Sequence, residues 1–102
     1  EKVVMKDKDA GNGAQLWTSK QVYKSGDPVV VGFRNMPDSK YCWISIAKTG
    51  TAGGDFIQYD WTYSKTDGQK EFTAELEPGT YEARAHFSRS RDISKRTFFK
   101  VE

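Results

Sequence analysis

One short run in the last third of the chain constrains the fold more than any other feature. Residues 76–81 read Leu-Glu-Pro-Gly-Thr-Tyr and lead into a stretch of alternating apolar and polar residues at 82–87. Pro78 and Gly79 favour a tight corner, and the hydroxyl of Tyr81 can fold back onto the backbone of that corner. A tyrosine in this position is typical of corners at which the chain leaves one sheet and enters a second sheet packed against it. The run therefore predicts a β-sandwich.

Alternating segments separated by turn residues continue along the chain and predict an all-β fold. Strands are expected at 15–23, 29–34, 41–48, 57–63, 72–76, 81–87 and 96–101, with a further short strand at 3–5. These seven or eight strands and the length of 102 residues predict one antiparallel β-sandwich domain, 1–102, in which 1–14 form a short strand and a flexible loop. The residues that alternate inward predict a core of Val29, Val31, Phe33, Ile44, Ile46, Phe72, Leu76, Tyr81 and Phe87.

The composition excludes several functional classes. A formal net charge of +2 is too small for a general binder of polyanions, so no specific nucleic-acid partner is expected. Cys42 is the only cysteine, which rules out an intrachain disulfide and a zinc cluster, and no cofactor is indicated. No apolar run approaches the roughly 18 residues of a membrane-spanning helix. The fold is therefore expected to depend on packing alone.

The first residue bears on where the protein works. The chain begins at Glu1 rather than Met, which favours a processed segment of a secreted or periplasmic protein. An excised domain of a cytosolic protein would begin in the same way. The expectation is an exported module.

Several motifs resemble the immunoglobulin-like or fibronectin-III-like modules of secreted bacterial proteins. They are Tyr-x-x-Gly-Asp-Pro at 23–28, Asn-Met-Pro at 35–37, Trp-Ile-x-Ile at 43–46 and Leu-x-Pro-Gly-x-Tyr-Glu-x-Arg at 76–84. The Trp-Ile-x-Ile strand is also similar to the membrane-recruitment sandwich called SKICH. The resemblance spans about residues 16–101 and implies an immunoglobulin-like sandwich with a tyrosine corner. It implies no particular activity.

Catalytic and metal-binding residues are poorly represented. The single histidine, His86, is expected on the exposed face of its strand beside Arg84, whose charge disfavours the imidazolium that a general base must form. Asp55 and Asp60 flank an aromatic strand, but a glycosidase needs a deeper cleft than a small sandwich offers. The run at 7–12 begins like a calcium loop, yet Thr18 stands where the bidentate Glu belongs. No enzyme activity and no metal site are predicted.

Aromatic residues provide the first candidate binding site. If Cys42, Ile44 and Ile46 face the core, Trp43 faces outward. Tyr59, Trp61 and Tyr63 then lie beside it, where aligned rings on a flat sheet would stack on sugar rings. Hydrogen bonds to sugar hydroxyls would come from Asn35, Gln58 and Asp60. The alternative is that these rings belong to the core, as the tryptophan of this strand does in immunoglobulin-like domains.

Basic residues around the last hairpin provide the second candidate site. They are Arg84, His86, Arg89, Arg91, Lys95 and Arg96. Such a patch suits a phosphate, a sulfate or an acidic protein surface. The alternative is a solvated, charged edge that discourages strand pairing between molecules.

The sequence thus predicts a non-catalytic binding or accessory module whose partner is a carbohydrate or another protein. Carbohydrate recognition would use the aromatic face, and contact with a protein or an anionic ligand would use the basic hairpin. The solvent exposure of Trp43 and Trp61 discriminates between these two interpretations.

Overall fold

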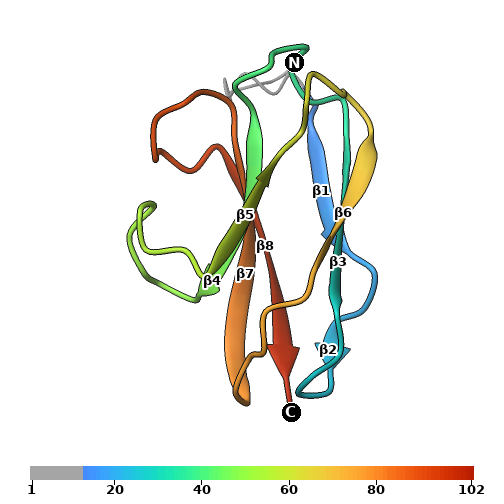
Figure 1. Cartoon of the computed structure of the whole chain (residues 1–102), viewed down its shortest axis with the longest axis vertical. Coiled ribbons are helices and arrows are strands. Elements are labelled where there is room, and N and C mark those ends of the chain that lie inside the picture. The colour runs from blue at the N-terminus through green and yellow to red at the C-terminus, as the bar shows by residue number, and fades with distance from the viewer. Residues whose placement is uncertain (1–12) are drawn as a thin grey trace.

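The computed structural model describes residues 13–102, which form two β-sheets packed face to face (Figure 1). The predicted strand at 3–5 and the calcium-like run at 7–12 lie outside the described residues. The strands are β1 (Gln15–Thr18), β2 (Val22–Tyr23), β3 (Val29–Arg34), β4 (Trp43–Lys48), β5 (Gln58–Trp61), β6 (Gly68–Phe72), β7 (Gly79–His86) and β8 (Lys95–Val101). The predicted all-β sandwich is confirmed.

The two sheets differ in size and in pairing. The smaller sheet has the strand order β1-β3-β6, and the larger sheet has the order β2-β8-β7-β4-β5. Neighbouring strands are antiparallel in every pair except β2 and β8, which are parallel. The prediction of a wholly antiparallel fold is wrong at this one pair. There the chain crosses from the smaller sheet to the larger one without reversing its direction (Figure 1).

The predicted long strand at 15–23 is also wrong, because it is divided between the two sheets. Side-chain hydrogen bonds replace the strand ladder at the break. The hydroxyl of Tyr23 lies 2.9 Å from Ser19 Oγ and accepts a hydrogen bond from the Lys20 N–H at 3.2 Å. Thr18 Oγ1 donates to the Lys20 carbonyl at 2.7 Å. Local bonds of this kind compete with sheet pairing and bend the chain.

The core lies between the sheets and follows the predicted alternation. The predicted core residues are buried, apart from Phe87, which is half-buried and packs against the others. Cys42 is fully buried with Ile44 and Ile46, as the inward alternation of this strand requires. Strand bounds differ where the chain turns earlier than expected. β5 ends at Trp61 because Tyr63 and the next residue adopt positive φ angles of 56° and 65°.

The predicted corner is present at the start of β7. The Tyr81 hydroxyl donates a hydrogen bond to the Glu77 carbonyl at 2.5 Å. Ser25 Oγ donates to the neighbouring Leu76 carbonyl at 2.8 Å, which ties the turn before β3 to the same corner. The sequence signal at 76–81 therefore specified a real backbone contact.

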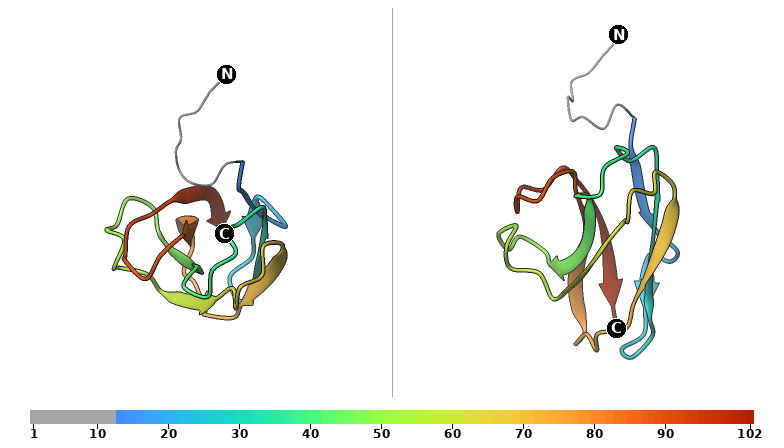
Figure 2. Two further views of the ribbon diagram at one scale, coloured as in Figure 1. Left: turned by 90° about the horizontal axis from the view of Figure 1, so that it is seen from above. Right: turned by 45° about the horizontal axis from the view of Figure 1, so that its top comes forward.

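Two loops lie on the outer side of the larger sheet, away from the smaller sheet (Figures 1 and 2). They are the β4–β5 loop, residues 49–57, and the β7–β8 loop, residues 87–94. The loops touch through their backbones, because a Cβ atom added at Gly53 would lie 1.9 Å from the Arg91 carbonyl oxygen. Within residues 13–102, no helix has the length and apolar character needed to cross a membrane.

Candidate functional site

The candidate site is built on the outer face of the larger sheet, where strand pairing aligns outward side chains in rows. Trp43 pairs with Trp61 on β5 and with His86 on β7. Ser45 pairs in the same way with Tyr59 and with Arg84. Paired residues on adjacent strands point to the same side of a sheet. The register therefore brings the predicted aromatic residues of β4 and β5 together.

Trp43 lies at the centre of this arrangement but is only 4% exposed. Its ring stacks on the His86 imidazole at 3.5 Å between centroids and 7° between planes, and its Nε1–H donates to the Ser88 carbonyl at 2.8 Å. Phe56 packs against it edge to face at 5.3 Å. Trp43 faces away from the core, as predicted, but residues of the two loops cover most of its ring, so little of it is exposed.

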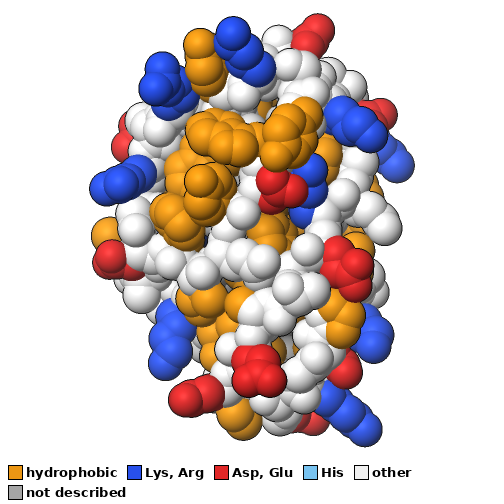
Figure 3. Space-filling view, in the orientation of Figure 1, with side chains coloured by type: hydrophobic (Ala, Val, Ile, Leu, Met, Phe, Trp, Pro, Cys, Tyr) orange, Lys and Arg blue, Asp and Glu red, His pale blue; other side chains and the backbone are white. Residues whose placement is uncertain are grey.

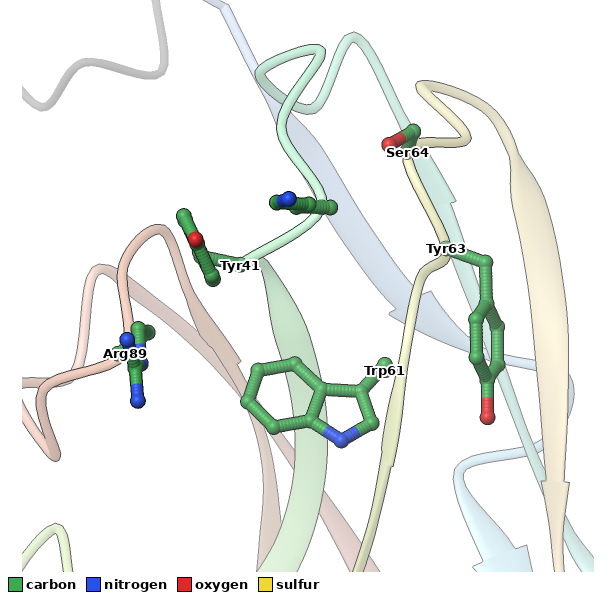
Figure 4. Close-up of a pocket in the computed structure, with 6 residues that line it drawn as sticks. Tyr41, Trp61, Tyr63, Ser64 and Arg89 are labelled. Carbon is green, nitrogen blue, oxygen red and sulfur yellow. The ribbon is translucent and has the colours of Figure 1, made fainter.

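Four other rings remain accessible around this centre. Tyr41, Tyr59 and Tyr63 are 41%, 46% and 65% exposed, and Trp61 is half-buried. The rings are not coplanar, since Tyr59 and Trp61 meet at 85°. The expected flat platform is therefore wrong. Figure 4 shows the Trp61 indole turned broad face towards the viewer, with Tyr41 and Arg89 on one side and Tyr63 on the other.

Two hollows meet at Trp61 and Arg89, which line both of them. The larger, of about 600 Å³, is completed by Lys40, Tyr41, Tyr63 and Ser64. The smaller, of about 190 Å³, is completed by Trp43, Phe56, Tyr59 and Arg91. We call the residues that line the two hollows the aromatic–basic face. Figure 3 shows hydrophobic side chains gathered over β5 and the upper end of β4, with Lys and Arg side chains at the margin.

Tyr63 forms one side of the larger hollow and is held from the neighbouring sheet. Its hydroxyl donates to Asp60 Oδ1 at 3.3 Å, and the negative charge of Asp60 raises the pKa of Tyr63. Lys70 on β6 lies 4.9 Å from the centre of the Tyr63 ring and forms a 3.2 Å ion pair with Asp60. Left-handed backbone angles at a tyrosine cost free energy and recur at functional sites. Here they coincide with the turn that presents the ring.

Tyr41 forms the opposite side of the larger hollow, and two cationic side chains lie close to its ring. The Arg89 guanidinium carbon lies 5.2 Å from the centre of the Tyr41 ring, and Lys40 Nζ lies 5.5 Å from it. These distances are within the range of cation–π attraction. The aromatic strand and the basic loop were predicted as separate sites, and the structure brings Trp61 and Arg89 into one.

Arg84 belongs to the predicted basic hairpin, but it is fully buried. Its Nε forms a 2.6 Å ion pair with Glu82 Oε2, and its terminal nitrogens donate to the Thr51 and Ala52 carbonyls at 2.6 and 2.9 Å. The predicted exposure of Arg84 is wrong because the β4–β5 loop folds over it. Its role is to fasten that loop to the sheet. Arg96 also lies apart from the aromatic–basic face, 3.8 Å from Glu82.

His86 is fully buried as well, against the expectation of an exposed side chain. Its Nδ1 lies 2.8 Å from the Asp92 carbonyl, and its Nε2 lies 2.9 Å from Ser45 Oγ. A carbonyl only accepts, so Nδ1 carries the proton, and Nε2 accepts from the Ser45 hydroxyl. Burial lowers the pKa of His86 to about 4, and the nearby charge of Arg84 acts in the same direction. The imidazole is therefore neutral near pH 7.

The Ser45–His86 pair has the hydrogen-bond geometry of a nucleophile and its base. Both side chains are fully buried, however, and Trp43 covers the imidazole ring. A substrate does not reach this pair in the folded chain. Its structural effect is clear, because His86 and Trp43 bind the carbonyls of Asp92 and Ser88. These two bonds bracket the loop segment that carries the exposed arginines.

Sequence reasoning missed several residues of the aromatic–basic face, namely Lys40, Tyr41, Phe56 and Ser64. All four lie outside the observed strands. Tyr41 stands at the start of the predicted strand at 41–48 but is not among the predicted site residues, and for the other three alternation gives no signal. Two of the predicted hydrogen-bonding residues are elsewhere: Gln58 Oε1 accepts from the Ala74 N–H at 2.9 Å, and Asn35 is not among the residues that line the hollows. Within residues 13–102, no three His, Cys, Asp or Glu side chains group as metal ligands.

Comparison with known proteins gives little further information. No family model matches the sequence, and no curated protein matches it. Among solved structures, the chain is similar to a β-glucosidase from Listeria innocua, crystallised with gluconolactone, at 17% identity and a TM-score of 0.43. The match covers 86% of this chain and 16% of the β-glucosidase. At that TM-score the likeness carries no argument about the present chain.

Proposed function

We propose that this chain is a non-catalytic binding module that holds one sugar ring of a carbohydrate on Trp61. The observation that carries the proposal is the position of this indole. Its broad face lies where two hollows meet, between Tyr41 and Arg89 on one side and Tyr63 on the other (Figure 4). A partly exposed aromatic surface of this kind with polar groups around it is suited to a ligand that is apolar on one face and polar at its edge.

A sugar ring has these properties. Its C–H face stacks on an aromatic ring and removes apolar area from water, which contributes about 1–3 kcal/mol at a small site. Ser64, Tyr59 and Tyr63 line the hollows and carry hydroxyl groups that suit sugar hydroxyls. The Tyr63 hydroxyl donates to Asp60 and can still accept a hydrogen bond. The steep angle between Tyr59 and Trp61 leaves a single stacking surface. One ring of a chain is therefore bound by stacking, rather than a row of rings.

The support beneath Trp61 favours binding. Trp43 lies 6.4 Å from Trp61 and is itself fixed by the His86 stack and by the Ser88 carbonyl. Tyr59 packs against both tryptophans at 5.7 and 6.0 Å. Side chains that are already ordered lose less entropy when a ligand binds. This network is a reason to expect a preformed site.

Two further features support the proposal of a binding module over an enzyme. The Ser45–His86 pair is covered, and the tyrosine corner together with the two-sheet strand order is consistent with an immunoglobulin-like module. The second predicted interpretation, contact through the basic hairpin alone, has less support because Arg84 and His86 are buried. Only Arg89 and Arg91 of that set line the hollows.

The test is a glycan-array screen followed by binding measurements on two matched variants. Trp61→Ala removes the proposed stacking surface. Trp17→Ala removes a tryptophan that is 41% exposed. Trp17 lies on β1 of the smaller sheet, which pairs with β3, whereas the site lies on the larger sheet. We expect Trp61→Ala to lose binding to the selected glycan and Trp17→Ala to retain it, with circular dichroism showing that both variants fold. Equal affinity of the parent and Trp61→Ala would overturn the proposal.

A further inference from the structure

The charges around Trp61 specify the ligand more closely than the aromatic rings do. Among residues 13–102, three cations line the two hollows, Lys40, Arg89 and Arg91, and no Asp or Glu of this range lines either one. These lining residues carry a formal charge of +3, whereas the net charge of the whole chain is only +2. A concentration of one sign at a recognition site attracts ligands of the opposite sign.

The acidic group next to Trp61 in the chain is already engaged. Asp60 lies next to Trp61 in the chain, and it forms the ion pair with Lys70 and accepts hydrogen bonds from Tyr63 Oη and from the Trp61 N–H at 2.9 Å. By contrast, among the residues that the structure describes, Arg89 and Arg91 form no salt bridge and donate no side-chain hydrogen bond. Both arginines line the hollows, and their side-chain donors have no partner among the described residues.

The orientation of Arg89 leaves its donors usable. The guanidinium contacts Tyr41 as a cation over a ring, which engages its face. All five N–H bonds of a guanidinium lie in its plane and suit a carboxylate or sulfate in a two-pronged contact. The hydrogen bonds of Trp43 and His86 to the carbonyls of Ser88 and Asp92 hold the segment that carries both arginines.

From these observations we infer that the saccharide is anionic, with a carboxylate or sulfate bound by Arg89 and Arg91 while its ring stacks on Trp61. The inference rests on the proposed function. A carboxylate on a pyranose ring projects from the ring edge. Figure 4 shows Arg89 to one side of the indole, so a ring lying on Trp61 can turn in its own plane until this group reaches Arg89.

The experiment compares polymers that differ only in charge. Polygalacturonic acid is compared with its carboxyl-reduced form, and dextran sulfate with dextran, by affinity electrophoresis and calorimetry on the whole chain. We expect one acidic polymer of these pairs to bind about 10- to 100-fold more tightly than its neutral partner, as for hydrogen bonds to a charged group. The pair in which the protein prefers the acidic polymer shows whether the recognised group is a carboxylate or a sulfate.

Variants then assign the effect to residues. Arg89→Gln keeps a polar side chain but removes the charge, and it is expected to lose most of the preference for the acidic polymer while retaining binding to the neutral one. Arg34→Gln is the matched control, because Arg34 lies 5.7 Å from the Trp17 ring on the smaller sheet. It is expected to leave both affinities unchanged. Added salt is expected to weaken the binding of the acidic polymer and not that of the neutral one, because salt screens exposed charges.

The outcomes separate the two proposals. Equal binding of acidic and neutral polymers would overturn the anionic specificity and leave the sugar-binding function standing. Binding of no polymer and of no arrayed glycan would overturn both. Poly-glutamate serves as a polyanion without sugar rings. If it binds as tightly as polygalacturonic acid, and Trp61→Ala has no effect on either, the face is a general anion-binding surface and the inference fails.

Discussion

The buried imidazole of His86 makes a quantitative prediction about acid stability. Its pKa is lowered from 6.5 to about 4, chiefly by burial. The unfolded chain therefore takes up a proton near pH 6.5, whereas the folded chain does so only near pH 4. Between these values the unfolded state holds more protons, so stability falls as the pH falls. Since each factor of ten in proton affinity is worth about 1.4 kcal/mol, the total loss is about 3 kcal/mol.

The assay is urea unfolding between pH 7 and pH 4, followed by tryptophan fluorescence. His86→Gln is the control, because glutamine keeps a neutral polar group there and the carboxylates that also titrate in acid are unchanged. Its lower starting stability does not matter, since only the slope against pH is compared. We expect the parent to lose about 3 kcal/mol more than the variant over this range. Parallel slopes would refute the reasoning.

A direct measurement supports the same test. His86 is the only histidine of the chain, so its imidazole Cε1–H gives a single histidine signal to follow by NMR. The folded protein is expected to show no titration of this signal near pH 6.5. A normal titration there would mean that the imidazole is accessible and that the β7–β8 loop is not fixed by the bond from Nδ1 to the Asp92 carbonyl.

Four further predictions concern stability and access. Tyr81→Phe removes the corner hydrogen bond and is expected to lower the free energy of unfolding by about 0.5–1.5 kcal/mol. Leu76→Ala leaves a cavity in the core and is expected to lower it by about 2–5 kcal/mol. Urea titrations with negligible shifts would contradict both predictions. Cys42 is buried, and burial raises the pKa of its thiol. Thiol reagents are therefore expected to label it rapidly only after unfolding, and fast labelling of the native chain would contradict this. Gly53→Ala would place a methyl group 1.9 Å from the Arg91 carbonyl, so it should displace the arginine segment and weaken binding of the acidic polymer, whereas unchanged affinity would show that this loop contact is dispensable.

The sequence predicted those features of the fold that depend on neighbours in the chain. The corner at Glu77 and Tyr81 was readable because its partners are four residues apart and Pro and Gly lie between them. The inward side of β4 was readable because Cys42, Ile44 and Ile46 alternate. The orientation of Trp43 followed from the same alternation.

What the outward side contacts could not be read in the same way. Alternation shows which residues face away from the core, but not whether water or a loop covers them. The burial of Trp43, Arg84 and His86 depends on two loops that return over the sheet, and those contacts join residues that lie far apart in the sequence. One local signal was present: Glu82 and Arg84 have opposite charges two residues apart on one strand face.

The site was only partly predictable for the same reason. Tyr59, Trp61 and Tyr63 were identified because they alternate. The turn at Tyr63, with its positive φ, ended the strand early and changed the flat row of rings into a hollow. Tyr41 and Phe56 lie in loops, and the hollows that Trp61 and Arg89 both line join β5 to a loop almost thirty residues later in the sequence. No pattern in the sequence marks such an arrangement.

The most direct test of the account follows the indole N–H signals of the three tryptophans by NMR while the tightest-binding glycan is added. Trp61 forms the proposed stacking surface, Trp17 lies on the smaller sheet, and Trp43 is buried with its N–H bonded to Ser88. We expect the Trp61 signal to move and saturate as the glycan is added, while the Trp17 signal stays in place. A shift confined to Trp17, or binding that leaves Trp61 unchanged, would contradict it.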